Sequence, residues 1–565
     1  MEEREELLER IRTSDPSLTK LHLVFAPSAY FDVENHERGL EAFLQLLRDN
    51  TSITYVLLER RLARGLSKSD HVRLVQAIFE IPLLKEVEIW SQQLSLPALW
   101  SSLTAAKELR KLGLGMVTLT DVPVMPSKDG ATISHIPNDD EALTPHPTLE
   151  TFYLSDFRLL PEVTGNNSNG DNDDDNNDEM KPKLDPVLEV LGHCPSLTRV
   201  EIFSFPEERP CITSVWPLFR ATPNLTHVTL RRLHLPASAV VISSQQSAVA
   251  INPLRVLDIG ENPLGDDGCA SLLRHLSNTQ SLWRTTLREL NLKSTLCTTD
   301  LSTVLWETLS EPLTLEKLNL ASNILRDDGA RVLARLLELP TFALQHLEVA
   351  RCHITNVGAT ALAHALTRNS SLRVLGLAYN KMNNESYVAF SKALARDNKA
   401  LQSINLQVDR KLIQTSGCMA LQEMCRENTT LRDVSTLLNM TVASAQAKYG
   451  NRIRMYLRLN QAGRAVVADN TATLAEWVQL LATVQDDLFA IHFLVRTYPH
   501  YAALAAQHLR CSEQGRQLEA PFGGLGCQEA QQRAQDESKR RGQAEAQTAV
   551  TKARQDAEAN RMTLS

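Results

Sequence analysis

The chain repeats a short pattern of apolar residues every 28 or 29 positions. The clearest copies begin at Leu315, Leu344 and Leu372, and each has apolar residues at offsets 0, 3 and 5. The last two lie two residues apart, as the buried side chains of a strand must, and an apolar pattern at helical spacing follows. One strand and one helix per repeat of this length predict a solenoid.

The same strand template predicts fourteen repeats along the chain. Their spacing is regular from Leu197 onward and irregular before it. We therefore expect an α/β leucine-rich solenoid over residues 18–440. The predicted repeats begin at Leu18, Ile53, Leu84, Leu109, Leu149, Leu197, Leu225, Leu254, Leu287, Leu315, Leu344, Leu372, Leu401 and Leu431.

The helical half of a repeat is clearest in the third quarter of the chain. Ala330, Leu333, Ala334 and Leu337 fall on one helix face that a neighbouring repeat can bury. Each large aliphatic side chain removed from water contributes about 1.5 to 3 kcal/mol to stability. We expect Asp327 and Asp328 to cap the free N–H groups at the start of this helix.

A polar position follows each strand. Asn262, Asn323 and Asn380 occupy it, and a side-chain amide there has both donors and an acceptor for unpaired loop backbone groups. We interpret these residues, with Cys352 in the same position, as a structural ladder and not as ligand contacts. Thr295 and Asp409 occupy the position in other repeats, so the ladder is imperfect.

The strand-turn segment LxxLxLxxN/C and the following GxxxL helix resemble the ribonuclease-inhibitor-type leucine-rich repeats. The resemblance implies a curved horseshoe with parallel strands on the concave face, helices on the convex face, and partners bound on the concave face. The sequence departs from the family pattern where Leu301 and Ser386 replace the helix glycine, and where extra residues precede Gly417.

Three further segments flank the predicted array. Residues 1–17 form an acidic N-terminal helix or cap, and residues 441–505 form a helical C-terminal cap, because an exposed last repeat would leave its apolar edge in water. The stretch YLRLNQAGR, which begins at Tyr456, resembles the C-terminal flank of leucine-rich-repeat families in algae. Residues 506–565 form a polar tail without a continuous heptad seam, which favours a frayed helix or disorder over a coiled coil.

Two polar insertions interrupt the array. Residues 164–180 are rich in Asp and Asn and have almost no apolar residue to offset the entropy of ordering them, which predicts a disordered acidic loop. The loop is either a tolerated surface insertion or a segment that attracts a basic partner by its charge. Its acidic residues do not meet the spacing of an EF-hand calcium site. The second insertion covers residues 121–147.

Composition narrows the class of protein. A net charge of -8 argues against a nucleic-acid partner, whose binding rests on clustered Lys and Arg. The acidic N-terminus is not a signal peptide, and no apolar run approaches the roughly 20 residues of a membrane span. Nine cysteines without a CxxC pair suggest neither a disulfide framework nor a zinc ribbon. We expect an intracellular, cytoplasmic protein without a membrane anchor, and a nuclear location stays open.

Catalytic and cofactor motifs are missing from the sequence. It contains no GxxxxGK[ST], HExxH or GxSxG. The pair Gly113 and Gly115 lacks the third glycine of a dinucleotide fingerprint and falls inside a predicted strand. We therefore predict no enzymatic activity, no cofactor and no metal site.

The candidate binding residues stand at offsets 2, 4 and 6, which face away from the buried leucines. There the strands carry aromatic residues beside charges of both signs, the mixture that dominates protein interfaces. The alternative for any single residue is an ordinary solvated sheet face. The predicted partner surface contains Trp90, Tyr153, Phe203, Arg231, Glu201, Asp258 and Glu348.

These observations favour a non-catalytic interaction scaffold or adaptor that binds a protein partner on the concave face. The alternative is a GTPase-activating protein resembling the Ran activator, which uses the same repeat type. That family ends its repeats with a strongly acidic tail, whereas the acidic run here is internal. A third hypothesis, a receptor fragment of the innate-immunity type, would need a nucleotide or effector module for which no motif occurs.

Overall fold

The computed structural model describes residues 2–31, 36–63, 66–122, 145–161, 183–204, 212–220, 222–241, 252–407, 415–435 and 445–517. By its internal contacts the chain divides into two compact parts, residues 1–457 and 458–565. The predicted acidic loop at 164–180, residue Asp409 and the tail beyond Gln517 lie outside the described residues.

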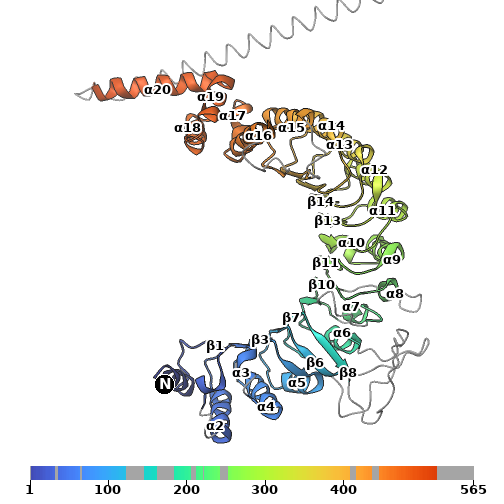
Figure 1. Ribbon diagram of the computed structural model, residues 1–565, viewed down its shortest axis with the longest axis vertical. Coiled ribbons are helices and arrows are strands. Elements are labelled where there is room, and N and C mark those ends of the chain that lie inside the picture. The colour runs from blue at the N-terminus through green and yellow to red at the C-terminus, as the bar shows by residue number, and fades with distance from the viewer. Residues whose placement is uncertain are drawn as a thin grey trace, which may run out of the picture. The chain divides into compact units, whose positions relative to one another are not determined.

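A parallel sheet of fourteen strands, counted over the described residues, runs through the first part in chain order (Figure 1). Every strand begins two residues after a predicted repeat start, so the predicted repeats and their register are confirmed, including the irregular ones before Leu197. The strands are β1 (Lys20–Leu23), β2 (Tyr55–Leu58), β3 (Glu86–Trp90), β5 (Lys111–Gly115), β7 (Thr151–Ser155), β9 (Arg199–Phe203), β10 (His227–Arg231), β11 (Val256–Asp258), β12 (Glu289–Asn291), β13 (Lys317–Asn319), β14 (His346–Glu348), β15 (Val374–Gly376), β16 (Ser403–Asn405) and β17 (Asp433–Ser435).

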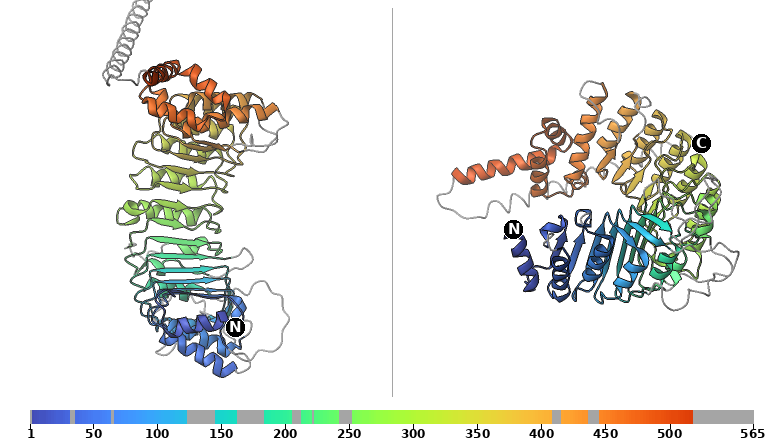
Figure 2. Two further views of the ribbon diagram at one scale, coloured as in Figure 1. Left: turned by 90° about the vertical axis from the view of Figure 1, so that its left-hand side faces the viewer. Right: turned by 60° about the horizontal axis from the view of Figure 1, so that its bottom comes forward.

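Helices follow the strands and lie along the other face of this sheet, which is the outer face of the first part (Figures 1 and 2). The arrangement is the α/β leucine-rich-repeat solenoid that the sequence predicts. The longer helices are α1 (Glu2–Arg12), α2 (His36–Asp49), α4 (Lys68–Phe79), α5 (Leu96–Leu103), α6 (Asp185–Gly192), α9 (Gly265–Ser277), α11 (Leu301–Leu309), α12 (Arg326–Leu337), α13 (Asn356–Leu366), α14 (Asn384–Ala395) and α15 (Thr415–Glu427). Short helical turns are α3 (Arg60–Ala63), α7 (Pro217–Arg220), α8 (Ala237–Val240) and α10 (Trp283–Thr286).

The core lies between the strands and the helices as one continuous strip. Leu318, Leu347 and Leu375 stand in register on β13, β14 and β15, and all three are buried. From the helical side, Leu333 and Leu337 of α12 are buried as predicted. Each repeat therefore completes the core of its neighbours, which is why one repeat alone cannot fold.

A second, three-stranded parallel sheet occurs among the described N-terminal repeats, and the sequence template did not predict it. It contains β4 (Gln93–Ser95), β6 (Thr118–Val122) and β8 (Arg158–Pro161). Leu94 and Leu119 pair in register there, and both are buried. Asp121, at which the second polar insertion was predicted to begin, belongs to β6, and residues 123–144 lie outside the described residues.

Helices make up the described residues of the second part. They are α17 (Arg464–Ala468), α18 (Leu474–Thr483), α19 (Leu488–Thr497) and α20 (Pro499–Gln517), and α16 (Ala445–Gln461) crosses the division between the parts. The buried rings of Trp477 and Tyr501 stack with centroids 5.5 Å apart and join α18 to α20. The ranges 1–17, 441–505 and 506–565 stay predictions. Among the helices that can be described, none combines the length and apolarity that a bilayer crossing needs.

The inner sheet face as candidate binding site

The inner face of the sheet presents three rows of side chains that run across the strands. In the middle row, Tyr153 pairs in register with Glu201, and the row continues through Thr229 to Asp258 and onward to Glu348. The next row places Phe203 beside Arg231. All seven predicted partner-surface residues are half-buried on this one face, although Trp90 on β3 and Glu348 on β14 are many strands apart.

Three of the predicted partner-surface residues on the inner face are aromatic: Trp90, Tyr153 and Phe203. The rings of Tyr153 and Phe203 meet edge to face, with centroids 5.4 Å apart and an interplanar angle of 82°. The indole of Trp90 lies across Gly115, where a Cβ would collide with the ring. A side chain at position 115 would force the Trp90 ring to move, which accounts for a glycine as the last residue of β5.

Arg231 is already engaged by acidic neighbours. Its guanidinium pairs with Glu261, and its Nε lies 3.9 Å from an Asp258 oxygen. Arg232 also pairs with Glu261, and Lys293 Nζ lies 3.3 Å from the same carboxylate. Burial opposes ionisation of Glu261, but the hydrogen bonds from Arg232 and Arg231 outweigh it and lower its pKa to about 2. Arg231 therefore serves an internal ion-pair network, and its role toward a partner stays a prediction.

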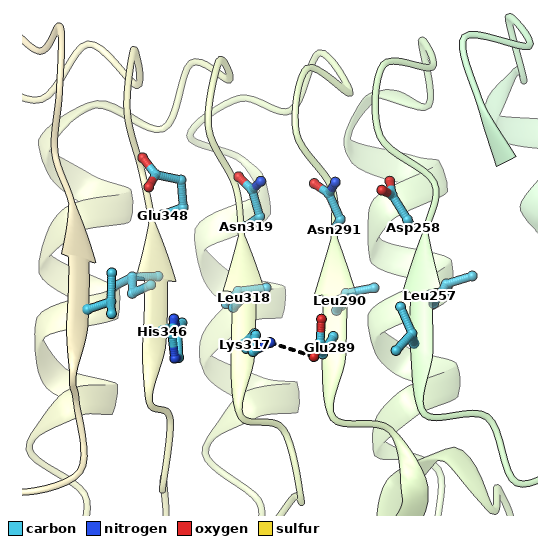
Figure 3. Close-up of a pocket in the computed structure, with 13 residues that line it drawn as sticks. Leu257, Asp258, Glu289, Leu290, Asn291, Lys317, Leu318, Asn319, His346 and Glu348 are labelled. Atoms are coloured by element: carbon cyan, nitrogen blue, oxygen red, sulfur yellow. Dashed lines mark hydrogen bonds and ion pairs between the residues drawn. The ribbon is translucent and has the colours of Figure 1, made fainter. Parts of the chain in front are cut away.

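A cleft of about 280 Å³ lies on the inner face from β11 to β15 (Figure 3). Four residues of the middle row of the inner face line one edge of this cleft: Asp258, Asn291, Asn319 and Glu348. Each of these side chains accepts a hydrogen bond from the backbone N–H two residues later, at N···O distances of 3.1, 3.0, 3.0 and 3.3 Å in that order. These contacts hold a line of side-chain oxygens in fixed positions at one edge of the cleft.

The charges in the cleft differ in how well they are compensated. Lys317 Nζ donates to Glu289 at 2.6 Å, and the pKa of His346 is lowered by burial and by the charge of Lys317. Burial raises the pKa of Asp258, opposed by hydrogen bonds from Gly260 and Asn291 and by the charge of Arg231. Burial also raises the pKa of Glu348, and only the N–H of Ala350 opposes it.

The asparagine ladder joins consecutive repeats through buried hydrogen bonds. Asn323 accepts from the N–H groups of Thr295 and Cys297 of the preceding repeat and donates to Leu292 and Leu320 oxygens. Asn262 and Asn380 make the same four bonds in their repeats. Cys352 fills the position with a thiol that donates to Leu320 O at 3.2 Å.

The predicted capping role of Asp327 is wrong, because its side chain does not bond to the start of its own helix. The Asp327 carboxylate instead accepts hydrogen bonds from Thr355 N, Thr355 Oγ1 and Gly358 N, and so caps α13 in the next repeat. Asp266 holds Thr298 in the same way, and Asp185 holds Thr213. A sequence template that treats each repeat separately cannot assign such bonds.

A rim of exposed and half-buried side chains, which sequence reasoning missed, borders the inner face. In nine repeats of the described chain, the residue directly after the inner-face position at offset 6 adopts a positive φ between 51° and 60°, which turns its side chain out of the sheet. Met116 and Tyr379 are about half exposed there, and the guanidinium of Arg351 lies over the Tyr379 ring at 4.7 Å. The sequence signal that could have identified these residues is their common position, seven residues after the start of a repeat. The rim residues are Ser91, Met116, Asp156, Arg232, Glu261, Ser294, Ser322, Arg351 and Tyr379.

No arrangement of three or more His, Cys, Asp or Glu residues suited to a metal ion occurs within the part of the chain that the structure describes. The cysteines Cys352, Cys418 and Cys425 are all buried.

Comparison with known proteins shows which repeats these resemble. A family described as leucine-rich repeat matches residues 251–273, 312–334 and 343–363. The ribonuclease inhibitor of Sus scrofa is 32% identical over 198 residues, which cover 34% of this chain and 40% of that protein. The NACHT, LRR and PYD domains-containing protein 4C of Mus musculus is 33% identical over 174 residues, which cover 30% of this chain and 16% of that protein.

The chain thus spans at most two fifths of the length of these relatives. Among solved structures, an internalin from Listeria monocytogenes aligns over 77% of this chain and 93% of its own at 14% identity with a TM-score of 0.35. The strand register, the asparagine ladder and the similarity to ribonuclease inhibitors agree on the repeat type. The array is built of leucine-rich repeats of the ribonuclease-inhibitor type.

Proposed function

We propose that the inner sheet face binds a protein partner and that the chain acts as a non-catalytic scaffold or adaptor. The observation that carries the proposal is the composition of this face. Half-buried aromatic and charged side chains stand on it in register, held by strands that pair along the whole array. Such rigid rows present a broad surface, and aromatic and Arg side chains are the usual energetic anchors of a protein interface.

The form of the surface supports a macromolecular partner over a small substrate. The inner-face rows extend over fourteen strands among the described residues, whereas the cleft of about 280 Å³ is lined by residues of only five of them. The name of one relative states that it inhibits ribonuclease, which is an action on another protein. A cytoplasmic location stays a prediction from the sequence.

Photo-crosslinking from the inner face tests the proposal. A photoreactive phenylalanine analogue replaces Tyr153, and in a matched control it replaces Val357, which is exposed on the outer helix α13. We expect a protein from a lysate to be crosslinked from position 153 and not from position 357. Equal crosslinking from both positions would contradict binding at the inner face.

The choice of anchor residues is tested separately. Trp90, Tyr153, Phe203 and Arg231 are changed together to Ala, and retention of the crosslinked partner is measured by co-purification. Loss of co-purification by a folded variant supports these anchors, whereas undiminished binding rejects them. Faster GTP hydrolysis by a purified small GTPase in the presence of this protein would instead favour the GTPase-activating alternative.

A further inference from the structure

The starting point is a contrast among the carboxylates in the middle row of the inner face. Glu88 lies 2.9 Å from Lys111 Nζ, Glu201 pairs with Arg199, and Asp258 lies 3.9 Å from Arg231. Glu348 is the exception among the described residues of this row. It accepts one hydrogen bond, from Ala350 N at 3.3 Å, and no cation forms an ion pair with it in the part of the chain that the structure describes.

Two cations, one from the preceding repeat and one from the same repeat, are engaged elsewhere. Lys317 is bonded to Glu289 at 2.6 Å, and the guanidinium of Arg351 lies over the ring of Tyr379. Neither residue forms an ion pair with Glu348. Among the described residues, the half-buried Glu348 carboxylate therefore has no counter-charge within the protein.

The structure also leaves room for a counter-charge from outside. The Glu348 side chain leans over Gly376, its partner in register on β15, where a Cβ would collide with the carboxylate. The next positions along these two strands are alanines, Ala350 and Ala378. Figure 3 shows the Glu348 carboxylate at the end of the row of side-chain oxygens, at the edge of the cleft.

Partial burial of a carboxylate without a counter-ion costs free energy, and an incoming cation reduces that cost without the need to break an existing ion pair. Arginine suits this geometry better than lysine, since its planar guanidinium meets both carboxylate oxygens and is more weakly hydrated than an ammonium. We propose that the cleft at Glu348 binds an arginine side chain of a protein partner, whose guanidinium pairs with the Glu348 carboxylate above Gly376. This inference rests on the proposed function and specifies one group of the partner.

The probe is a fluorescein-labelled Gly/Ser heptapeptide with a single central arginine, and its binding to the full chain is followed by fluorescence anisotropy. The same peptide with citrulline, which keeps the shape and loses the charge, should bind at least about tenfold more weakly. The lysine peptide should lie between the two. Equal binding of the citrulline peptide, or of the lysine peptide, would overturn the assignment to arginine, and absence of saturable binding by the arginine peptide would overturn the site.

Two protein variants separate the charge of Glu348 from its position. Glu348→Gln removes the charge and keeps the shape, whereas Gly376→Ala keeps the charge and displaces the side chain. Both should weaken arginine-peptide binding by at least about tenfold, since each removes the charge-assisted contact. The control Glu307→Gln, on an exposed position of the outer helix α11, should leave binding unchanged within about twofold.

Unchanged binding by folded Glu348→Gln would overturn the proposal, and circular dichroism melting confirms that each variant is folded. A pH series gives an independent readout, because arginine keeps its charge while Glu348 becomes protonated as the pH falls. Binding should decline toward acidic pH in the wild type and stay flat in Glu348→Gln; a flat wild-type profile speaks against the site. Crosslinking from position 153 does not depend on this contact, so failure here leaves the proposed function separately testable.

Discussion

A single asparagine side chain in a repeat serves the backbones of two repeats at once. Asn323 is buried and bonds to Thr295 N, Cys297 N and Leu292 O of the preceding repeat and to Leu320 O of its own repeat. Asn323→Ala leaves buried N–H and C=O groups without partners, and each such group costs about 1 to 3 kcal/mol. We expect the free energy of unfolding to fall by at least about 2 kcal/mol in urea titrations.

A neighbouring asparagine provides the control for this experiment. Asn319 is half-buried on the inner face and bonds to one backbone group, Ala321 N. Asn319→Ala should therefore cost less than about 1 kcal/mol. Equal losses for the two variants would mean that the ladder bonds contribute no more than an ordinary surface turn.

Protonation of one buried histidine should make stability depend on pH. His275 is packed against Trp216 and Trp283, with ring centroids 5.1 and 4.8 Å away. Burial lowers its pKa from 6.5 to about 4. Below about pH 6.5 the unfolded chain binds a proton that the folded chain excludes, so stability falls as the pH drops toward 4.

This contribution amounts to roughly 2 kcal/mol between pH 7 and pH 5. His275→Gln should reduce the pH dependence of the unfolding free energy by that amount, measured in urea at the two pH values. Other buried histidines, including His71 and His146, remain in both proteins, so the comparison isolates one residue. The same pH slope in wild type and variant would contradict the prediction.

At the scale of elements, the start of one helix is held by an acid from the preceding helix. Asp327 of α12 accepts hydrogen bonds from Thr355 and Gly358 at the start of α13. Asp327→Ala should cost about 1 to 3 kcal/mol and accelerate amide exchange in the first turn of α13. Asp328→Ala should cost less than about 0.5 kcal/mol, because Asp328 makes only an exposed ion pair with Arg331. Similar exchange in both variants would exclude the cross-repeat cap.

The sequence was sufficient for features that recur at fixed offsets within a repeat. The buried leucines gave the strand starts, and Asn262, Asn323 and Asn380 stand in the position where an amide is needed. A second asparagine ladder was also readable, since Asn369 precedes Leu372 by three residues just as Asn398 precedes Leu401. The hydrogen bond between Asp327 and Thr355 could not be predicted from the sequence, because it joins two repeats. An acidic residue at the start of a helix is also expected to cap that same helix.

The candidate site was only partly predictable for the same reason. The offsets place Glu348 and Arg231 on the inner face, but they do not show which side chains lie next to them. Arg231 proves to be bonded to Glu261, whereas Glu348 stands beside a glycine at 376. The extra strands β4, β6 and β8 escaped a template that seeks one strand per repeat.

At the scale of the whole array, each strand of the main sheet pairs only with the strands of adjacent repeats among the described residues. Stability in such an array is a sum of repeat and nearest-neighbour terms, so damage in one repeat should spread only a short way. Leu347→Ala removes a buried side chain from β14 and should cost about 2 to 5 kcal/mol through the cavity it leaves. The matched control is Val357→Ala, at an exposed position of α13, the helix that follows β14; this change should cost less than about 0.5 kcal/mol.

Hydrogen exchange followed by mass spectrometry then reports where the loss of stability is felt. Exchange in Leu347→Ala should accelerate most in β13, β14 and β15 with the helices that follow them, because these elements share the damaged core. Exchange in β1, β2 and β3 should change by less than about twofold, since six strands of the main sheet lie between β3 and β13, the nearest of the affected strands. Uniform acceleration along the array would show that the repeats unfold as one cooperative block, and an unchanged denaturation midpoint would contradict the central register itself.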